Sequence, residues 1–325
     1  AVETAIKISV AYHKARGEGQ RFRFVGRERA YHGMNIGATS VGGMVNNVKT
    51  FASVLMPGVV HMRHTHLPEH KFISGQPETG AELANDLERI CTNFGAENIS
   101  ACIVEPIAGS TGTLVPPKGY LQRLREICDK HGILLIFDEV ITAFGRLGDS
   151  FAANRFNVRP DIITMAKGLT SAVIPMSAVA FDTAIYDQLM EGPEAMIELF
   201  HGYTYSGHPV ACAAGIATLD VYQEEGLFDK AKELEPIFEE ALHSLKGLNQ
   251  VIDIRNIGLM GAVQFGPGKL PATEFAANVF QHCYDNDVLV RYSGEFLVLS
   301  PSLIASNEHI HKISDALRNA IEANS

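Results

Sequence analysis

Short apolar segments that lack polar alternation recur along the chain and alternate with stretches of helical spacing. Two of them, ISACIVEP at 99–106 and ILLIFDEV at 133–140, enclose a segment whose apolar residues lie about one helical turn apart. These residues are Leu121, Leu124, Ile127 and Cys128. The pattern predicts a strand, a helix and a second strand. Because both strands are apolar throughout, we expect a parallel sheet that is covered on both faces.

The same pattern continues in PDIITMAKG at 160–168 and in PMSAVAF at 175–181. A long helical stretch follows from about residue 212, then a charged helix, and the rest of the chain mixes strands with helices. We therefore predict an α/β large domain over 1–214 and a smaller α+β C-terminal domain over 215–325, with the boundary inside the connecting helix. The length of 325 residues suits two domains of this kind.

Composition and charge narrow the class of partner. The chain is 46% hydrophobic, so it can bury a large core, and 27 Lys and Arg against 37 Asp and Glu give a formal charge of −10. This balance argues against nucleic acids and anionic membranes and favours small molecules. No apolar run approaches the roughly 18 residues of a membrane span. Five scattered cysteines without a C-x-x-C pair indicate buried thiols. We expect a cytoplasmic protein.

The apolar run ILLIFDEV ends in two adjacent carboxylates, Asp138 and Glu139. Ligands of parallel sheets bind at the carboxyl ends of the strands, which places these residues at a candidate site. Adjacent strand residues point to opposite faces, so we expect one carboxylate to face a ligand and the other a structural partner. A buried carboxylate stays charged only beside a cation or good donors. The protonated ring nitrogen of a cofactor fits Asp138, and a salt bridge to Arg146 fits it equally well.

A lysine, Lys167, ends the next apolar run. Burial disfavours the ammonium form, which gives an amine suited to Schiff-base chemistry, whereas a surface lysine with its charged end in water is the commoner arrangement. Twenty-nine residues separate Lys167 from Asp138, about the length of one helix and one strand. That spacing predicts that both side chains lie at one edge of one sheet.

These segments, FDEVITAFGR, PDIITMAKG and the later HGYTYSGHP, together resemble the class III (ω-amino acid) aminotransferases. The resemblance covers essentially the whole chain and is nearest to the β-alanine–pyruvate branch. It implies a fold type I transferase of the aspartate aminotransferase kind, with a mostly parallel sheet in the large domain. It also implies pyridoxal 5'-phosphate as the cofactor and no metal.

The resemblance assigns roles to several residues around that cofactor. Asp138 matches the residue that binds the pyridine nitrogen, and Lys167 matches the lysine that binds the cofactor as a Schiff base and moves the substrate proton. Tyr31, in RERAYHGM, matches the aromatic residue stacked on the pyridine ring and contacts substrate. The adjacent His32 is placed among the cofactor-binding residues, and Val140 matches the aliphatic residue on the opposite ring face.

Three further positions carry roles implied by the resemblance. Glu105 matches an acid near the cofactor, either a positioning residue or part of a structural ion pair. Thr204, in GYTYSGHP, matches a threonine that reaches the cofactor phosphate of the partner subunit, which implies a homodimer or a dimer of dimers. Arg291, in VLVRYSGEF, matches a mobile arginine. A guanidinium binds a carboxylate through two hydrogen bonds and would clamp pyruvate or alanine.

The chain also departs from the family pattern. Ala143 stands where the family usually has glycine, Ser171 and Ala172 stand where it has Asn-Gly, and a Pro-Pro-Leu pattern reads Pro-Ser-Leu at 301–303. We expect the first to alter a turn and the second to reshape the site beside Lys167. The family also has a Gly-Ser phosphate-binding turn just before the segment that matches AVETAIK. We therefore expect upstream residues in a longer protein, the alternative being an incomplete gene product.

The sequence thus predicts transfer of an amino group from an ω-amino acid or amine such as β-alanine to pyruvate, giving alanine. The alternatives are a 4-aminobutyrate or taurine aminotransferase, an aminomutase, and a truncated non-catalytic homologue. The histidine-rich HMRHTHLPEH at 61–70 has no usual metal-ligand spacing, and we expect a polar surface loop there. No G-x-G-x-x-G or Walker A loop supports a nucleotide site, and AGSTG lacks the helix that follows a nucleophile elbow.

Overall fold

The computed structural model describes residues 1–192 and 198–324. A six-stranded sheet forms the centre of the large domain, with the strand order β2-β1-β3-β4-β5-β6. Its strands are β1 (Arg23–Arg27), β2 (Val59–Met62), β3 (Ile99–Val104), β4 (Leu134–Asp138), β5 (Ile162–Met165) and β6 (Ala178–Phe181). Five of these strands, β1 to β5, run parallel, which confirms the predicted parallel sheet.

The edge strand β6 differs from expectation because it runs antiparallel to β5. The sequence pattern placed PMSAVAF in the parallel series, and that prediction is wrong. A parallel neighbour needs a crossover of a dozen or more residues, usually a helix. Only the 3₁₀ helix η5 (Lys167–Leu169) and a turn lie between β5 and β6, so the chain reverses direction.

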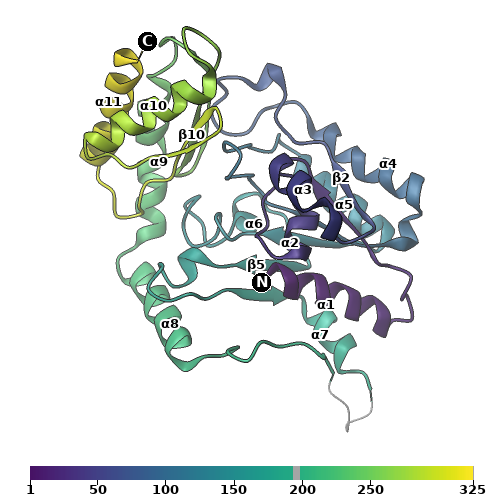
Figure 1. Cartoon of the computed structure of the whole chain (residues 1–325). Helices are drawn as coiled ribbons and strands as arrows, with labels where there is room; N and C mark the ends of the chain where they lie inside the picture. Colours follow the sequence, from purple (N-terminus) through teal and green to yellow (C-terminus); the bar gives the residue numbers. More distant parts are fainter. Residues whose placement is uncertain (193–197, 325) are drawn as a thin grey trace.

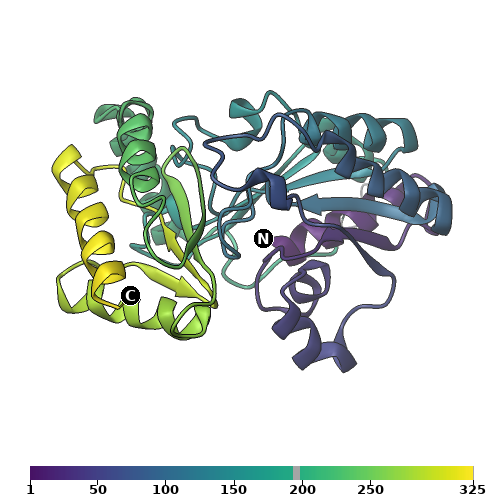
Figure 2. The ribbon, with the colours of Figure 1, turned by 90° about the horizontal axis from the view of Figure 1, so that it is seen from above.

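Helices cover both faces of this sheet (Figures 1 and 2). The helices of the large domain are α1 (Val2–Ala15), α2 (Ile36–Val41), α3 (Val45–Phe51), α4 (Asn85–Phe94), α5 (Tyr120–His131), α6 (Ala152–Arg155) and α7 (Thr183–Met190), with short 3₁₀ helices at Ala52–Val54, Pro68–His70, Ala81–Ala84 and Ala96–Asn98. Helices α4 and α5 lie on one face and α1 and α7 on the other. The two-sided cover explains why the strands carry no polar alternation.

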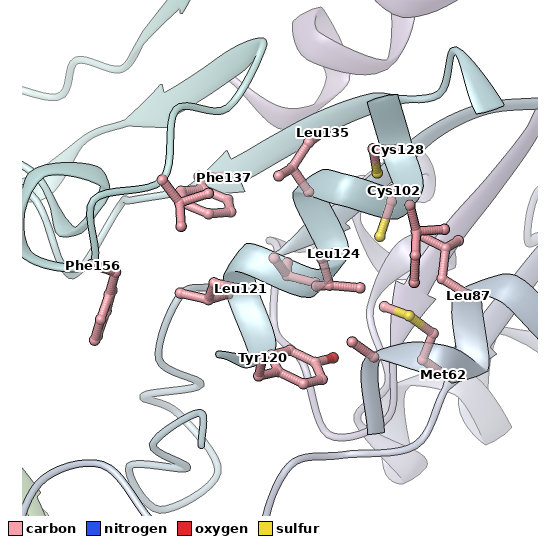
Figure 3. Close-up of a cluster of buried hydrophobic side chains, with 14 of the residues drawn as sticks. Met62, Leu87, Cys102, Tyr120, Leu121, Leu124, Cys128, Leu135, Phe137 and Phe156 are labelled. Carbon is pink, nitrogen blue, oxygen red and sulfur yellow. The ribbon is translucent and has the colours of Figure 1, made fainter. Parts of the chain in front are cut away.

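Strand β4 shows how side chains divide between the two faces. Leu135 and Phe137 pack into the cluster under α4 and α5 (Figure 3), whereas Leu134 and Ile136 pack against the face covered by α1. Continuing the alternation puts Asp138 on the α1 face and the next residue on the opposite face. The helix before it, α5, ends at Gly132, which has φ +64° and lets the chain turn directly into β4.

The small domain contains an antiparallel sheet of strand order β7-β8-β10-β9. Its elements are α9 (Leu227–His243), β7 (Val251–Ile257), β8 (Met260–Phe265), α10 (Ala272–Asp285), β9 (Arg291–Ser293), β10 (Phe296–Leu299) and α11 (Asn307–Ala323). The helices pack on the sheet around a separate apolar core. Figure 2 shows this domain, green to yellow, beside the large domain.

Helix α8 (Pro209–Glu224) connects the two parts and leads through Gly226 into α9 (Figure 1). The predicted boundary near residue 215 falls inside α8, and the assignment of 1–214 and 215–325 as domains stays a prediction. None of the helices in this described part of the chain combines the length and the apolar composition that a bilayer crossing needs.

Candidate active site

A cavity of about 970 Å³ opens where the carboxyl ends of the parallel strands face the small domain. Three candidate residues lie at the ends of the neighbouring strands β3, β4 and β5: Glu105 directly follows β3, Asp138 is the last residue of β4, and Lys167 lies two residues beyond β5. The cavity wall includes Val140, Phe144, Lys167, Tyr222, Arg291 and Leu303. Both domains therefore contribute to one site, and the predicted gathering of Asp138 and Lys167 at a single sheet edge is confirmed.

Asp138 is 4% exposed and has two hydrogen-bond partners. One carboxylate oxygen, Oδ2, lies 2.7 Å from His32 Nδ1, and the other accepts from the backbone N–H of Val140 at 3.1 Å. The alternative partner, Arg146, instead donates to the carbonyls of Leu259 and Pro301. The buried carboxylate is thus held in place by a histidine and a backbone amide, and the salt bridge to Arg146 does not form.

Glu139 points to the other face, as the strand alternation requires. Its carboxylate accepts hydrogen bonds from the N–H groups of Ala152 and Ala153, at the start of α6, and from the hydroxyl of Thr142. Burial raises the pKa of Glu139 to about 7. Glu139 therefore has the structural partner that was predicted for one of the two adjacent carboxylates, and the contact of Asp138 with a ligand stays a prediction.

Lys167 lines the cavity from a backbone conformation that L-residues rarely adopt, with φ +45°. Burial lowers the pKa of its amine, and the charges of Asp138 and Glu105 act in the opposite direction. The charge of Arg291 adds to the lowering. A partly buried amine with a lowered pKa is a better nucleophile and proton acceptor than a surface lysine.

Glu105 is fully buried and binds two backbone amides. Its carboxylate accepts from the N–H of Tyr31 at 2.9 Å and from the N–H of Gly109 at 3.2 Å. Both of these contacts are to backbone amides, which favours the positioning alternative over an ion pair, and the role of Glu105 stays a prediction. Burial raises its pKa, while the nearby His32 opposes that rise. Glu105 fixes the backbone of the segment that carries Tyr31 and His32.

The remaining predicted residues divide into two groups. Val140 and Arg291 line the cavity, and Arg291 begins β9, the edge strand of the small-domain sheet. Thr204 is exposed and lies outside the cavity wall. Its place agrees with the role implied by the resemblance, contact with a partner's cofactor, and that role stays a prediction.

The residues present fit pyridoxal phosphate. His32 has no exposed side-chain surface, and its second ring nitrogen, Nε2, has no hydrogen-bond partner in the structure. His32 is a fixed support for Asp138, whose charge acts on the amine of Lys167. A buried carboxylate suits a protonated pyridine nitrogen, and an amine on the cavity wall with a lowered pKa suits the cofactor aldehyde.

Backbone strain is concentrated around the cavity. Ten non-glycine residues in the described chain have positive φ, and half of them line the cavity wall. These are Thr113, Phe144, Lys167, Ser171 and Ala172. The family's Asn-Gly would suit the consecutive left-handed residues, φ +48° and +64°, better than Ser171 and Ala172 do. Ala143 has no positive φ, so alanine there causes no such strain.

Replacing Ala172 by glycine is expected to raise the free energy of unfolding by about 1 kcal/mol, because glycine adopts φ +64° without a Cβ clash. Urea denaturation measures the change. The same replacement at Ala143, where φ is ordinary, is the matched control and is expected to lower stability by about 0.5–1 kcal/mol. A loss of stability in both variants would show that Ala172 is not strained.

Sequence reasoning missed Tyr222, Phe144 and Arg146 as part of the cavity, because only tertiary packing brings them there. It was also wrong about the histidine-rich segment. His61 belongs to β2, His70 is buried, and His66 Nε2 lies 3.2 Å from Asp253 Oδ2 of the small domain, so the segment packs between the domains. In the described residues, no group of three or more His, Cys, Asp or Glu side chains is arranged to hold a metal.

Comparison with known proteins places this site in a family. The family model for aminotransferase class-III matches residues 1–321. An omega-aminotransferase of Caulobacter vibrioides is 54% identical over 98% of this chain and 73% of its own length. A beta-alanine–pyruvate aminotransferase of Pseudomonas aeruginosa is 46% identical over 98% of this chain and 71% of its own.

A solved structure supports the same family assignment. An amine transaminase from an uncultivated Pseudomonas species, in its PLP-bound form, superposes with a TM-score of 0.93 at 36% identity, over 100% of this chain and 75% of that one. The predicted fold, the aminotransferase activity and the dependence on pyridoxal phosphate are thereby confirmed. With a strand-end acid, a lysine on the cavity wall and this likeness in sequence and fold, the chain belongs to the class III aminotransferases.

Proposed function

We propose that this enzyme transfers the amino group of an ω-amino acid or amine, such as β-alanine, to pyruvate and so forms alanine. The names of the two sequence relatives support this substrate class. The observation that carries the proposal is the place of Arg291, which lines the same cavity as Lys167 and is close enough for its charge to act on the lysine. A guanidinium in that position suits the carboxylate of an oxo acid or amino acid.

Each residue has a part that follows from its surroundings. Asp138, fixed by His32, would hold the proton on the ring nitrogen of pyridoxal phosphate. When bound, the cofactor supplies a ring that takes up the electrons of the bond broken at the amino-bearing carbon. Lys167 Nζ, with its lowered pKa, accepts the proton from that carbon and later returns one. Glu105 keeps the Tyr31 backbone in place beside them.

The side chain of Arg291 is free to move, as binding two different substrates requires. It is exposed at the start of an edge strand, and in the described part of the chain it forms no ion pair. The side chain can therefore bind the carboxylate of pyruvate and move aside for a donor whose carboxylate lies farther from the reacting carbon. A simple amine needs no such contact.

Replacing Arg291 by alanine is expected to raise the KM for pyruvate about 10- to 100-fold, the effect of losing charged hydrogen bonds of about 1.5–3 kcal/mol. The half-reaction of an amine without a carboxylate should change less than about threefold, since it makes no such bond. Stopped-flow measurement of each half-reaction separates the two. Arg159→Ala, which removes a surface arginine paired with Asp182, is the control.

An equal loss for both substrates would mean that Arg291 has only a structural part. Omitting the oxo acid tests the same-fold alternatives. Product formed without any acceptor would indicate an aminomutase. A strong preference for 4-aminobutyrate or taurine over β-alanine would redirect the donor assignment.

We also infer that the working unit is a dimer, because Thr204 lies outside the wall of the cavity that holds Lys167 and its role by resemblance needs a second subunit. The cytoplasmic location stays a prediction, and the five free thiols fit a reducing compartment.

A further inference from the structure

Tyr222 connects the helix between the domains to the segment that carries Lys167. It lies on α8, lines the cavity, and its hydroxyl donates a hydrogen bond of 2.7 Å to the carbonyl of Gly168. Its ring lies 6.3 Å from that of Phe144 in a stacked arrangement and 5.5 Å from that of Phe228. The hydroxyl and the ring thus have separate partners.

The partner residue, Gly168, directly follows Lys167 in the 3₁₀ helix η5. Lys167 holds φ +45°, a left-handed conformation that is unfavourable for an L-residue. Such residues persist only where the surroundings fix them, and they gather at functional sites. The short helix has one bond of 3.0 Å, from the Leu169 N–H to the Ala166 carbonyl, and a weaker one of 3.3 Å from the Thr170 N–H to the Lys167 carbonyl.

Phe144 limits the same segment from another side. A Cβ on Gly168 would come within 3.1 Å of Phe144 Cβ and Cδ2, so Gly168 is packed tightly against that ring. Phe144 is in turn stacked on Tyr222. The Gly168 peptide is therefore held by a packed ring and by two bonds to its carbonyl. The Ser171 N–H donates a long bond of 3.4 Å and the Tyr222 hydroxyl a short one of 2.7 Å, so the hydroxyl is the stronger restraint on the orientation of the carbonyl.

We propose that Tyr222 is a positioning residue whose hydroxyl, by holding the Gly168 carbonyl, keeps the amine of Lys167 directed into the cavity. The proposal rests on the proposed function of Lys167. Removing the hydroxyl leaves the half-buried carbonyl with only the long bond from the Ser171 N–H and allows the peptide after Lys167 to rotate, which relaxes the strained backbone and moves the amine.

A change in the position of Lys167 is measurable without any cofactor. The pKa of its amine is lowered by burial, raised by the charges of Asp138 and Glu105, and lowered by that of Arg291. An amine that turns towards water loses part of the burial effect, so its pKa rises. Burial also raises the pKa of Tyr222, which keeps its hydroxyl protonated and donating near neutral pH.

The experiment compares wild-type and Tyr222→Phe proteins stripped of cofactor. Reductive methylation at a series of pH values, read by peptide mass spectrometry, gives the titration midpoint of Lys167. We expect the midpoint in Tyr222→Phe to rise by at least about half a pH unit. In the cofactor-loaded enzyme, kcat should fall about three- to tenfold, the size of one neutral hydrogen bond, with the KM for pyruvate unchanged within about twofold.

The control is Tyr12→Phe, which removes a hydroxyl that accepts from Arg16 on the surface of α1. It should leave the Lys167 midpoint and kcat unchanged. An unchanged midpoint in Tyr222→Phe, with thermal stability lowered or not, would overturn the proposal and leave Tyr222 a packing residue. The proposed function is tested by a different experiment: if Lys167→Ala still retained the cofactor covalently, the function assigned to Lys167 would be wrong. The titration midpoint does not depend on that result, because it is measured on cofactor-free protein.

Discussion

Replacing Lys167 by alanine is expected to abolish covalent retention of pyridoxal phosphate and to lower turnover by at least about 10²- to 10⁴-fold, the contribution of a positioned proton-transfer group. The reason lies in the site: the amine lines the cavity with a lowered pKa and with Asp138 and Glu105 close enough for their charges to act on it. Borohydride reduction followed by mass spectrometry locates the attached pyridoxyl group. The wild-type protein should carry it on the peptide that contains Lys167.

The matched control is Lys118→Ala, which removes a surface lysine paired with Glu78. That variant should keep both the attached group and full turnover. Attachment to another lysine in Lys167→Ala, with turnover retained, would contradict the assignment. A variant that loses the covalent link but still binds the cofactor reversibly would agree with it, because the other cavity residues remain.

The second large effect is expected for Asp138→Asn. The amide is isosteric with the carboxylate, and its one oxygen can still accept from His32 Nδ1. It loses the bond from the Val140 N–H and carries no charge to hold a proton on a ring nitrogen. We expect kcat to fall at least about 10²-fold, as for loss of a preorganised electrostatic group. The absorbance of bound cofactor as a function of pH checks the cause, since the proton should leave the ring at a lower pH.

The stability of Asp138→Asn separates chemistry from folding. A neutral amide needs less hydration than a carboxylate with 4% exposure, so the free energy of unfolding should fall by less than about 1 kcal/mol. Asp161→Asn is the comparison, because Asp161 binds Arg125 and the Leu135 amide at the other end of the same strands. It should lower stability and spare kcat. If Asp138→Asn instead lowered the free energy of unfolding and spared kcat, Asp138 would be a structural residue.

Much of the site is predictable from the sequence because it depends on local order along parallel strands. In the register of β4 and β5, Asp138 lies opposite Thr164, and Lys167 follows three residues later. An apolar run that ends in a polar residue therefore predicts that this residue is close to the core and lies at the carboxyl edge of the sheet. The division between Asp138 and Glu139 also follows from alternation alone.

Other features depend on contacts that no local pattern encodes. His32 meets Asp138 across 106 residues of sequence, and the Gly168 carbonyl meets Tyr222 across 54. The reversal into β6 was missed because a short apolar strand has the same composition in either direction. Segment 61–70 reads as polar, yet His70 is buried and His66 pairs with Asp253 of the small domain.

The paired carboxylates at the end of β4 also limit how the gene can vary. Loss or gain of one residue inside this strand would exchange the faces of everything that follows in it. Asp138 would then meet the amides of Ala152 and Ala153, and Glu139 would enter the cavity on a longer side chain. One such event would remove the anchor of α6 and the acid of the site together. We therefore expect natural variation in this stretch to proceed by substitution, with insertions and deletions displaced to the turns on either side.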